Sequence, residues 1–309
     1  MKVSVLVLAY NHERFIAQAL DGALLQEVDF PYEIVVGEDC STDSTRRILR
    51  DYQERFPDRI RLLLPERNLG MMGNFMATFK ECRGDYIAML EGDDYWTAPD
   101  KLQRQVDFLD AHPECCASFH NARVVHDAAP ERDRLFHEAP LAKTFFGLDE
   151  VASSHFIPTC STLFRRGLYP GLPEWFRDMP MGDWPLHILN AEHGSYAYLD
   201  RVMASYRVHG GGAWSGSSRL SVIEKTIKAC DLINLNTGGR YSKAMARLTR
   251  NLEIEAAEIF KDEGDFARAW GRLKRAFRIS PASCGRTFKS GCRLLSAWLW
   301  CGCLGKGAC

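Results

Sequence analysis

The segment Tyr86-Ile87-Ala88-Met89-Leu90-Glu91-Gly92-Asp93-Asp94-Tyr95-Trp96 decides how this chain is interpreted. Its first half is a continuous apolar run that predicts a buried strand, and its second half gathers three acidic side chains. Carboxylates just beyond the C-terminal end of a strand lie where open α/β sheets bind their ligands. Such groups repel one another unless donors or a cation compensate, and Mg²⁺ or Mn²⁺ would take carboxylate and phosphate oxygens. The alternative for an isolated acidic cluster is a solvated turn that opens a helix.

Strand and helix patterns alternate in the sequence before this segment and just after it. Val3 to Ala9 is a continuous aliphatic run, which is typical of a strand covered on both faces. Ser41 is placed to cap the helix that follows the second strand. The alternation predicts an α/β fold with a mixed, mostly parallel sheet and helices on both faces. The expected strands span 3–9, 33–37, 60–64 and 85–90, and the expected helices span 13–26, 42–56, 73–82 and 101–112.

The pattern after residue 115 is less regular. Glycine and serine cluster from Gly210 to Ser218, which predicts that a first domain spans 1–217. A helical extension is expected over 218–290, and its segment from Ala256 to Pro281 has the pattern of one tetratricopeptide-like helix pair. Within the first domain we expect strands at 116–122 and 159–165, a polar loop at 125–143, a helix at 183–193 and a strand-like return at 196–206.

Residues 291–309 form a short apolar and basic tail that contains cysteines. Its apolar run from Leu294 to Leu304 is shorter than the ~20 residues that a membrane-spanning helix needs. A basic, tryptophan-rich segment of this kind either lies in a membrane interface or packs back on the protein. Cys301, Cys303 and Cys309 are either incidental thiols or a metal site, and no second pair stands at zinc-like spacing.

The composition allows one large domain with an appendage, because the chain has 309 residues of which 46% are apolar. Its net charge of −1 predicts neither a nucleic-acid-binding stripe nor an acidic tail. The eleven cysteines are scattered, and the chain enters its first strand at Val3 without a charged leader or cleavage site. We therefore expect a cytoplasmic protein with mostly free thiols that does not bind nucleic acid.

Two common nucleotide-binding motifs are missing from the sequence. No G-x-G-x-x-G follows a strand, which argues against dinucleotide-dependent dehydrogenases, and no G-x-x-x-x-G-K-[ST] is present, which argues against P-loop NTPases. A phosphate group would therefore have to be held by a metal ion and side chains. The acids Glu91, Asp93 and Asp94 are suited to that task.

Polar residues also follow other predicted strands. Tyr10-Asn11 ends the first strand, where the turn can meet a ligand or be a plain turn. The carboxylate of Asp39, after the second strand, can accept a hydrogen bond from a base N–H such as N3 of uracil. We expect Asp39 to face a ligand while Ser41 and Asp43 shape the turn and the helix start. Asn68-Leu69-Gly70 is either another turn or part of the same site.

Two later segments carry further chemistry. Gly182-Asp183-Trp184 precedes a predicted helix, and its carboxylate can accept a proton from an attacking hydroxyl or cap the helix. Tyr206-Arg207-Val208-His209 lies just before the glycine run. His209 can ligate a metal or bind a diphosphate, and Arg207 can bind a diphosphate, although a single histidine can equally be structural.

Taken in order, these segments resemble the family 2 glycosyltransferases of the GT-A fold. The resemblance covers roughly Val3 to Ser217, and its specificity comes from the co-occurrence of the pieces in one order. The segments that carry it are 3–13 (opening strand and turn), 33–43 (nucleotide-base motif), 68–70 (following loop) and 93–102 with Gln105 (metal motif and trailing helix).

The resemblance implies roles for individual residues. Asp183 resembles the catalytic base of the family. Asp94, or Asp93 in the alternative register, would be the direct metal ligand, and His209 would be a late metal or diphosphate contact. Asp93 would otherwise reach the ribose and the diphosphate, or the metal through water. The residues that would bind the nucleotide and donor are Ala9, Tyr10, Asn11, Glu13, Asp39, Asn68, Gly70, Asp93 and Arg207.

The sequence departs from the family pattern at four places. Glu38 and Glu91 stand where the family commonly has Asp, which keeps the charge but changes its reach. Gly182-Asp183 replaces the usual Glu-Asp pair, which weakens the assignment of Asp183. Ala9 replaces a frequent Pro or Thr, a change that we expect to be harmless.

The resemblance implies an inverting sugar transfer from a nucleotide-diphosphate donor, with a UDP-sugar favoured and Mg²⁺ or Mn²⁺ as the cofactor. The acceptor would be a glycan or lipid-linked hydroxyl in bacterial surface polysaccharide or glycoconjugate synthesis. Trp184 or Trp96 would pack against sugar or base, with core packing as the equal alternative for Trp96. The tail would allow peripheral contact with the inner face of the cell membrane. The alternatives are a sugar-nucleotide nucleotidyltransferase, which would normally carry glycines where residues 10–15 have none, and a non-catalytic nucleotide-binding scaffold.

Overall fold

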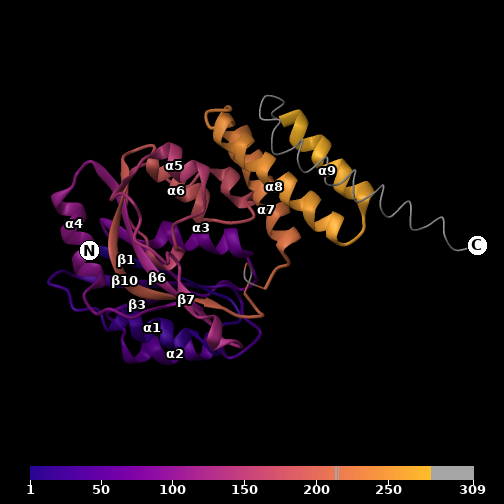
Figure 1. Ribbon diagram of the computed structural model, residues 1–309. Helices are drawn as coiled ribbons and strands as arrows, with labels where there is room; N and C mark the ends of the chain where they lie inside the picture. Colours follow the sequence, from indigo (N-terminus) through magenta and orange to yellow (C-terminus); the bar gives the residue numbers. More distant parts are fainter. Residues whose placement is uncertain (213, 215, 280–309) are drawn as a thin grey trace, which may run out of the picture. The chain divides into compact units, whose positions relative to one another are not determined.

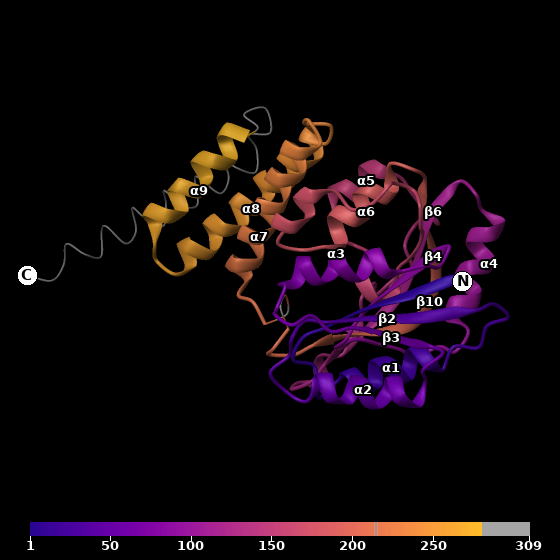
Figure 2. The same cartoon turned by 180° about the vertical axis from the view of Figure 1, so that it is seen from behind.

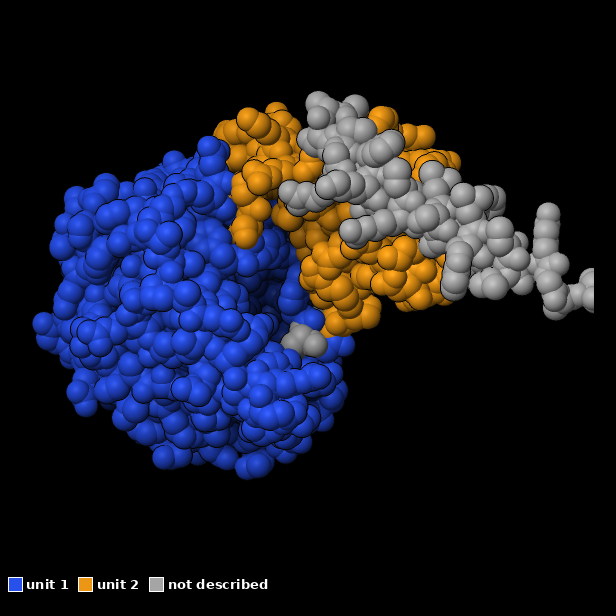
Figure 3. Space-filling view, viewed as in Figure 1, with its two compact units in different colours: residues 1–151, 155–216 blue, residues 152–154, 217–309 orange. Residues whose placement is uncertain are grey.

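A computed structural model describes the chain at residues 1–212, 214 and 216–279. The chain forms two compact units, which Figure 3 distinguishes by colour. Unit 1 comprises Met1–Val151 and His155–Gly216, and unit 2 comprises Ala152–Ser154 and the chain from Ser217 onward. The predicted tail at 291–309 lies outside the described residues, and the domain limits inferred from the sequence stay a prediction.

Unit 1 is built on one mixed sheet. Four parallel strands form its first half in the order β3-β2-β1-β4, and every residue of β1 and β2 is buried, as expected for strands covered on both faces. In the pairing register Ala9 is opposite Glu38 and Leu8 is opposite Glu91, so these three strands end at the same edge. The bounds are β1 (Val3–Ala9), β2 (Tyr32–Glu38), β3 (Ile60–Leu63) and β4 (Tyr86–Glu91).

Helices cover both faces of this sheet, as the alternation predicted. Figures 1 and 2 show α1 and α2 below the strands and α3 on the opposite face. A large apolar core lies between β1, β2 and β4 and the helices α1, α2 and α4, through side chains such as Leu20, Leu49 and Val106. The helix bounds are α1 (Ile16–Leu24), α2 (Thr45–Arg55), α3 (Met71–Glu81) and α4 (Lys101–Ala111).

The second half of the sheet makes it mixed. Strand β9 is antiparallel to both β4 and β6, β10 is parallel to β6, and the short β5 pairs antiparallel with the end of β10. Two further short strands pair outside this order, β7 with β6 and β8 with β10. The bounds are β5 (Tyr95–Trp96), β6 (Cys115–His126), β7 (Arg134–Leu135), β8 (Phe145–Phe146), β9 (Leu163–Arg165) and β10 (Ser195–Val208).

Shorter elements complete unit 1 and correct three expectations. Helix α2 begins at Thr45 after Ser44, so Ser41 is not its cap. Residues 159–161 form a 3₁₀ turn rather than the start of a strand, and the loop expected at 125–143 contains the end of β6 and all of β7. The elements are η1 (Pro130–Arg132), α5 (Leu148–Ser153), η2 (Thr159–Ser161), η3 (Glu174–Asp178) and α6 (Asp183–Ala191).

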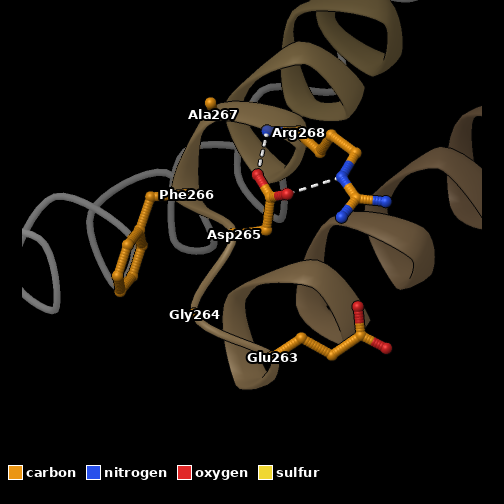
Figure 4. Close-up of a pocket in the computed structure, with 6 residues that line it drawn as sticks. All are labelled: Glu263, Gly264, Asp265, Phe266, Ala267 and Arg268. Atoms are coloured by element: carbon orange, nitrogen blue, oxygen red, sulfur yellow. Dashed lines mark hydrogen bonds and ion pairs between the residues drawn. The ribbon is translucent and has the colours of Figure 1, made fainter.

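Up to residue 279, unit 2 contains the helices α7 (Arg219–Asn236), α8 (Ser242–Asp262) and α9 (Phe266–Ile279), which confirms a helical extension over this described part. Apolar side chains of α7 and α8 form one small core, and those of α8 and α9 form another. At the α8–α9 turn a depression is lined by residues 263–268 (Figure 4). There Asp265 accepts hydrogen bonds from the backbone N–H (2.9 Å) and Nε (2.5 Å) of Arg268, so it acts as the cap of α9.

No helix within the described ranges is both long enough and apolar enough to cross a membrane.

Candidate functional site

The loops after β1 and β2 lock onto each other at the carboxyl edge of the sheet. Asn11 has a left-handed backbone (φ 56°), and its Oδ1 accepts a hydrogen bond from the Thr42 N–H at 2.9 Å. Glu13 Oε2 accepts from the Ser44 N–H at 2.9 Å, while Asp43 Oδ2 accepts from the Glu13 N–H at 3.0 Å. These reciprocal bonds hold the two loops in a fixed relation, so Asn11 and Glu13 contribute at least to the shape of the site.

Asp39 bonds to the loop at residues 68–70. These contacts do not by themselves test whether Asp39 binds a ligand. Its side chain is buried, and its Oδ1 accepts from the Leu69 N–H at 2.6 Å. Asn68 donates from Nδ2 to the Asp39 carbonyl at 2.8 Å and accepts from the Gly70 N–H at 2.9 Å. Gly70 has φ 76°, a conformation that side chains other than glycine rarely adopt. Asn68 and Gly70 therefore position the loop that holds Asp39.

The residue pair at the end of β1 has two different environments. Ala9 is buried, and its carbonyl accepts from the Asp39 N–H at 3.0 Å, so the two strand ends are joined. Tyr10, by contrast, is 46% exposed, which leaves a large aromatic side chain at the edge of the sheet. The exposed ring of Tyr10, next in sequence to the bonded Ala9, offers an apolar face for a planar ligand.

Glu38 has a structural part, which explains the change from the family's Asp. Its side chain is fully buried, and Oε1 accepts from the Ser41 N–H at 2.5 Å. The same carboxylate pairs with Arg46, which also donates to the Pro65 carbonyl at 3.1 Å. The longer side chain thus reaches into the loop and to α2.

Asp93 is the acidic residue that faces two imidazoles. Its Oδ2 lies 2.9 Å from His209 Nε2 and 3.9 Å from His12 Nε2. Burial works to raise the pKa of Asp93, but the hydrogen bond from His209 and the charges of both histidines leave it lowered. His12 lies in the opening segment 3–13, in which the sequence analysis gave it no role of its own. Its pKa is lowered, mainly by burial, against the attraction of Asp93.

Asp94 lies behind Asp93 and faces the last long strand. It is 2% exposed, and its Oδ1 accepts from the backbone N–H of Arg207 at 2.8 Å. Its Oδ2 is buried and has no hydrogen-bond partner in the part of the chain that the structure describes, although the Cys160 thiol acts to lower the pKa of Asp94. Burial and the nearby Asp93 charge outweigh this effect and raise that pKa well above its ordinary value.

Glu91 connects this group to Asp183. Burial raises the pKa of Glu91, and the charges of Asp93, Asp94 and Asp183 raise it further. The fold therefore brings Asp183, which is some ninety positions later in the sequence, within electrostatic range of the acidic segment.

Arg207 holds the acidic segment in place. Its Nε donates to the Asp93 carbonyl at 2.8 Å, and a terminal nitrogen donates to Gln18 Oε1 at 2.6 Å. The guanidinium lies over the rings of Phe15 (4.7 Å) and Tyr95 (5.1 Å), and the side chain is only 12% exposed. Through these contacts Arg207 positions the acidic segment. Its predicted contact with a donor stays a prediction.

Asp183 is the first residue of α6, and Gly182 precedes it as the cap. Its Oδ1 accepts from the Trp184 N–H and its Oδ2 accepts from the Thr159 hydroxyl, both at 2.8 Å. The sequence did not predict the contact between Thr159 and Asp183, because that contact depends on the conformation of the η2 turn.

The two tryptophans expected to meet a sugar or base are buried. Trp96 is 3% exposed and donates its indole N–H to the Cys160 carbonyl at 2.8 Å. Trp184 is 2% exposed, donates to the Val151 carbonyl at 2.9 Å, and has the His155 ring 4.2 Å away. The expectation that Trp184 packs against a ligand was wrong, and Trp96 follows the alternative of core packing, because both indoles are buried and bonded inside the protein.

No three potential metal ligands group together within the described ranges. Asp93 and His209 nevertheless form a carboxylate–imidazole pair, and the next residue, Asp94, has a buried Oδ2 that accepts no hydrogen bond from a nitrogen or oxygen of the described residues. Mg²⁺ is usually bound by one or two carboxylates together with substrate phosphates, rather than by a cage made only of protein. The residues present therefore fit a cation whose remaining ligands come from a diphosphate and water.

The family model described as glycosyl transferase family 2 matches residues 4–170, which is more than half of the chain. An uncharacterized protein of Mycobacterium tuberculosis is 39% identical over 214 residues, which cover 69% of this chain and 60% of that protein. The chain thus spans about 60% of the length of this relative. An uncharacterized glycosyltransferase of Nostoc sp. is 28% identical over 88% of this chain and 87% of its own. The succinoglycan biosynthesis protein ExoO of Rhizobium meliloti is 38% identical over 46% of this chain and 38% of its own.

Solved structures share the fold. TarS residues 1–349 of S. aureus, in complex with UDP-GlcNAc, superposes with a TM-score of 0.63 and 18% identity, covering 96% of this chain and 89% of that one. The mannosyltransferase PcManGT of Pyrobaculum calidifontis, in complex with GDP-Man and Mn²⁺, gives 0.61 and 18%, covering 97% and 82%. These likenesses confirm the GT-A architecture predicted from the sequence.

Proposed function

This chain belongs to glycosyl transferase family 2, and from that premise we propose that it transfers a sugar from a nucleotide-diphosphate donor to a hydroxyl acceptor with inversion at the anomeric carbon. The observation that carries the proposal is the contact between Asp93 and His209, together with Asp183 within electrostatic range of the same acidic segment at Glu91. The family also includes relatives named for polysaccharide synthesis, such as ExoO.

Asp93 and His209 would hold a divalent cation, Mg²⁺ or Mn²⁺, and Asp94 would support them from behind. The contacts favour Asp93 over Asp94 as the direct ligand, because Asp93 faces the histidines whereas Asp94 Oδ1 is occupied by the Arg207 N–H. A bound cation supplies Lewis-acid stabilisation of the negative charge on a leaving diphosphate. PcManGT, which shares the fold, contains Mn²⁺ together with its nucleotide sugar.

Asp183 would act as the general base. Its carboxylate removes the proton from the acceptor hydroxyl while that oxygen attacks the anomeric carbon from the face opposite the leaving group. The bond from the anomeric carbon to the diphosphate oxygen breaks with its electron pair, and the nucleoside diphosphate departs. Each of the two Asp183 oxygens accepts one protein hydrogen bond, which leaves lone-pair capacity for a proton.

The base-binding end would lie at the loops after β1 and β2. Asp39 would accept a hydrogen bond from a base N–H, and the exposed ring of Tyr10 would contact the base. The loops that support Asp39 contain Ala9, Asn11, Glu13, Asn68 and Gly70. We favour a UDP-sugar because N3–H of uracil is a donor suited to a carboxylate. The structural neighbours hold UDP-GlcNAc in one case and GDP-Man in another.

The acceptor would be a glycan or a lipid-linked hydroxyl, as in the synthesis of a bacterial surface polysaccharide or glycoconjugate. We place this reaction in the cytoplasm, with peripheral contact at the inner face of the membrane through residues 291–309. Removing residues 291–309 and measuring partition into membrane vesicles tests that contact; an unchanged partition would contradict it.

The catalytic proposal is tested with Asp183→Asn. UDP-glucose, UDP-galactose, UDP-N-acetylglucosamine and GDP-mannose are each incubated with the protein and Mn²⁺, and release of the nucleoside diphosphate is measured. We expect Asp183→Asn to lower kcat by at least ~10²-fold, because it removes the base, while nucleotide binding by calorimetry is retained. Asp178→Asn, an exposed aspartate on η3, serves as the matched control and should retain activity.

Metal dependence is tested in the same assay. We expect EDTA to abolish turnover and Mn²⁺ or Mg²⁺ to restore it, because the leaving diphosphate would lose the Lewis acid that stabilises its developing charge. Pyrophosphate-dependent exchange without glycoside formation would support a nucleotidyltransferase instead, and unchanged turnover in Asp183→Asn would remove the proposed base.

A further inference from the structure

The 3₁₀ turn η2 carries a hydroxyl that touches the proposed base. Thr159 Oγ1 donates a hydrogen bond of 2.8 Å to Asp183 Oδ2, and the side chain of Thr159 is almost buried. Because the other oxygen of Asp183 accepts from the Trp184 N–H, the carboxylate is held at both ends. We propose that Thr159 is a positioning residue that sets the orientation of the Asp183 carboxylate for proton removal. The inference rests on the proposed function of Asp183.

The turn itself is anchored to the acidic segment and to α4. The indole N–H of Trp96 donates to the Cys160 carbonyl at 2.8 Å, and Gln105 Nε2 donates to the Ser161 carbonyl at 2.9 Å. Ser161 closes the turn by donating its hydroxyl to the Pro158 carbonyl at 2.6 Å. Cys160 and Ser161 are fully buried, so water does not compete for these bonds.

Gln105 is in turn oriented by Lys101. The Lys101 ammonium donates to Gln105 Oε1 at 2.7 Å, which directs the amide nitrogen of Gln105 toward η2. The amide nitrogen also approaches the Ser118 hydroxyl at 3.2 Å on β6. The strands β5 and β6 and the helix α4 therefore fix the backbone that carries Thr159. A hydroxyl on so constrained a turn can fix the carboxylate plane, whereas a hydroxyl on a mobile loop could not.

Without this hydrogen bond the carboxylate would rotate about its terminal torsion, which is broad and weakly restricted by itself. Rotation moves the lone pair that must meet the acceptor proton, and a misplacement of about 1 Å can cost ~10²-fold in rate. Donor binding should be untouched, because the hydroxyl of Thr159 bonds to Asp183 and, among the described residues, to none of those proposed to hold the nucleotide or the metal. The expected signature is a lower kcat with an unchanged KM for the donor.

The test compares three variants in the nucleoside-diphosphate release assay, with whichever of the four named sugar nucleotides the wild type turns over fastest. Thr159→Val keeps the shape and removes the hydroxyl, and we expect kcat to fall about 10–100-fold with donor KM within ~2-fold. Thr159→Ser keeps the hydroxyl, and its kcat should stay within about 3-fold of the wild type, because the hydrogen bond remains. Thr162→Val makes the same change in a buried threonine of the same segment, whose hydroxyl makes a long hydrogen bond of 3.5 Å to the Pro158 carbonyl.

The outcomes separate this inference from the proposed function. A loss confined to Thr159→Val, with rescue by serine and a normal thermal midpoint, supports the positioning role. Equal loss in Thr159→Val and Thr162→Val, or a rise in donor KM that accounts for the loss, overturns it in favour of a purely structural threonine. If Asp183→Asn is inactive while Thr159→Val is fully active, the inference fails and the base assignment stands. If Asp183→Asn is fully active, both fail.

Discussion

Lys101 is a fully buried lysine close to the acidic segment. Its ammonium lies 4.1 Å from the centroid of the Trp96 ring and donates to Gln105, but no carboxylate bonds to it in the described residues. Burial lowers its pKa from the ordinary value of 10.5 to about 7, against a smaller opposing effect of Cys160. The charged form of this side chain is therefore a cost that folding must overcome.

We expect Lys101→Met to stabilise the protein by up to about 3 kcal/mol at pH 6, because an apolar side chain of similar length replaces a buried charge. The advantage should shrink as pH rises. Between pH 7 and 10.5 the unfolded chain binds more protons at this site than the folded protein, so the wild type gains stability with pH. Urea unfolding of both proteins at pH 6, 7.5 and 9.5 measures the difference.

Lys80→Met serves as the control, because Lys80 is exposed on α3 and should show no such trend. A stability difference between Lys101→Met and the wild type that is the same at all three pH values would contradict the expected titration.

At the residue scale, the sequence predicted which acidic residues lie together, but it did not predict which partners each of them has. The sequence left Asp93 and Asp94 as alternative metal ligands, and the contacts that distinguish them come from His209 and the Arg207 backbone. The sequence marked Glu38 only as a departure from the family's Asp with a changed reach, and its carboxylate bonds to the Ser41 N–H and to Arg46. These hydrogen-bonding partners lie outside the strands that end at the acids, so no local sequence pattern predicts them.

At the scale of elements, Gly37 lets α3 approach the middle of the sheet. A Cβ at this position of β2 would lie 1.9 Å from Thr78 Oγ1 and 2.5 Å from Asn74 Oδ1. Asn74 donates from Nδ2 to the Gly37 carbonyl at 2.8 Å, so the helix is bonded to the strand as well as packed on it. The absence of a side chain at Gly37 thus sets the distance between β2 and α3.

We expect Gly37→Ala to destabilise the protein by about 1–3 kcal/mol, because overpacking must displace α3 or break its bond to β2. The measurement is the urea midpoint at constant slope. Gly171→Ala is the matched control, since a Cβ there would meet no atom within 4 Å and the change should be near neutral. Equal midpoints for Gly37→Ala and the control would show that the helix yields without cost.

Elements with a strong local pattern were predicted closely, and those set by tertiary contacts were not. The run from Val3 to Ala9 and the strand ending near Glu91 agree with the structure within a residue or two. Residues 159–161 contain threonine, cysteine and serine, which suit a strand by composition. They form a 3₁₀ turn instead, because Trp96 and Gln105 bond to their carbonyls.

At the scale of the whole molecule, each compact unit has an apolar core of its own. The residues that we propose for the donor, the cation and the base all belong to unit 1, whereas α7, α8 and α9 supply the cores of unit 2. Ligand binding should therefore stabilise one unit directly.

We expect differential scanning calorimetry to resolve two transitions, of which UDP with Mn²⁺ raises only the one that belongs to unit 1. At a UDP concentration of ~100 Kd the shift should be about 5–10 °C for a unit of this size. Assignment comes from Asp265→Ala, which removes the cap of α9 and should lower only the other transition. A single transition that UDP moves as a whole would show that the units unfold together.

The order of the sheet was beyond sequence reasoning at this scale. The sequence indicated a mostly parallel sheet, but the return strand β10 pairs with β6, whose residues lie about eighty positions earlier. No repeat or motif marks that pairing, because it is decided by how the intervening segments pack.

Two bonds that close the acidic cluster, Asp94 to the Arg207 amide and Asp93 to His209, join positions 113 and 116 residues apart. A ribosome that adds about 5–20 residues per second makes the acids roughly 6–20 seconds before the strand that secures them. A nascent chain released at residue 170 would contain everything that the family model matches and yet lack Asp183, Arg207 and His209. Truncated products of this length should therefore fail to transfer sugar even though they contain most residues of the proposed nucleotide site, because the proposed base Asp183 and the proposed metal contact His209 are missing.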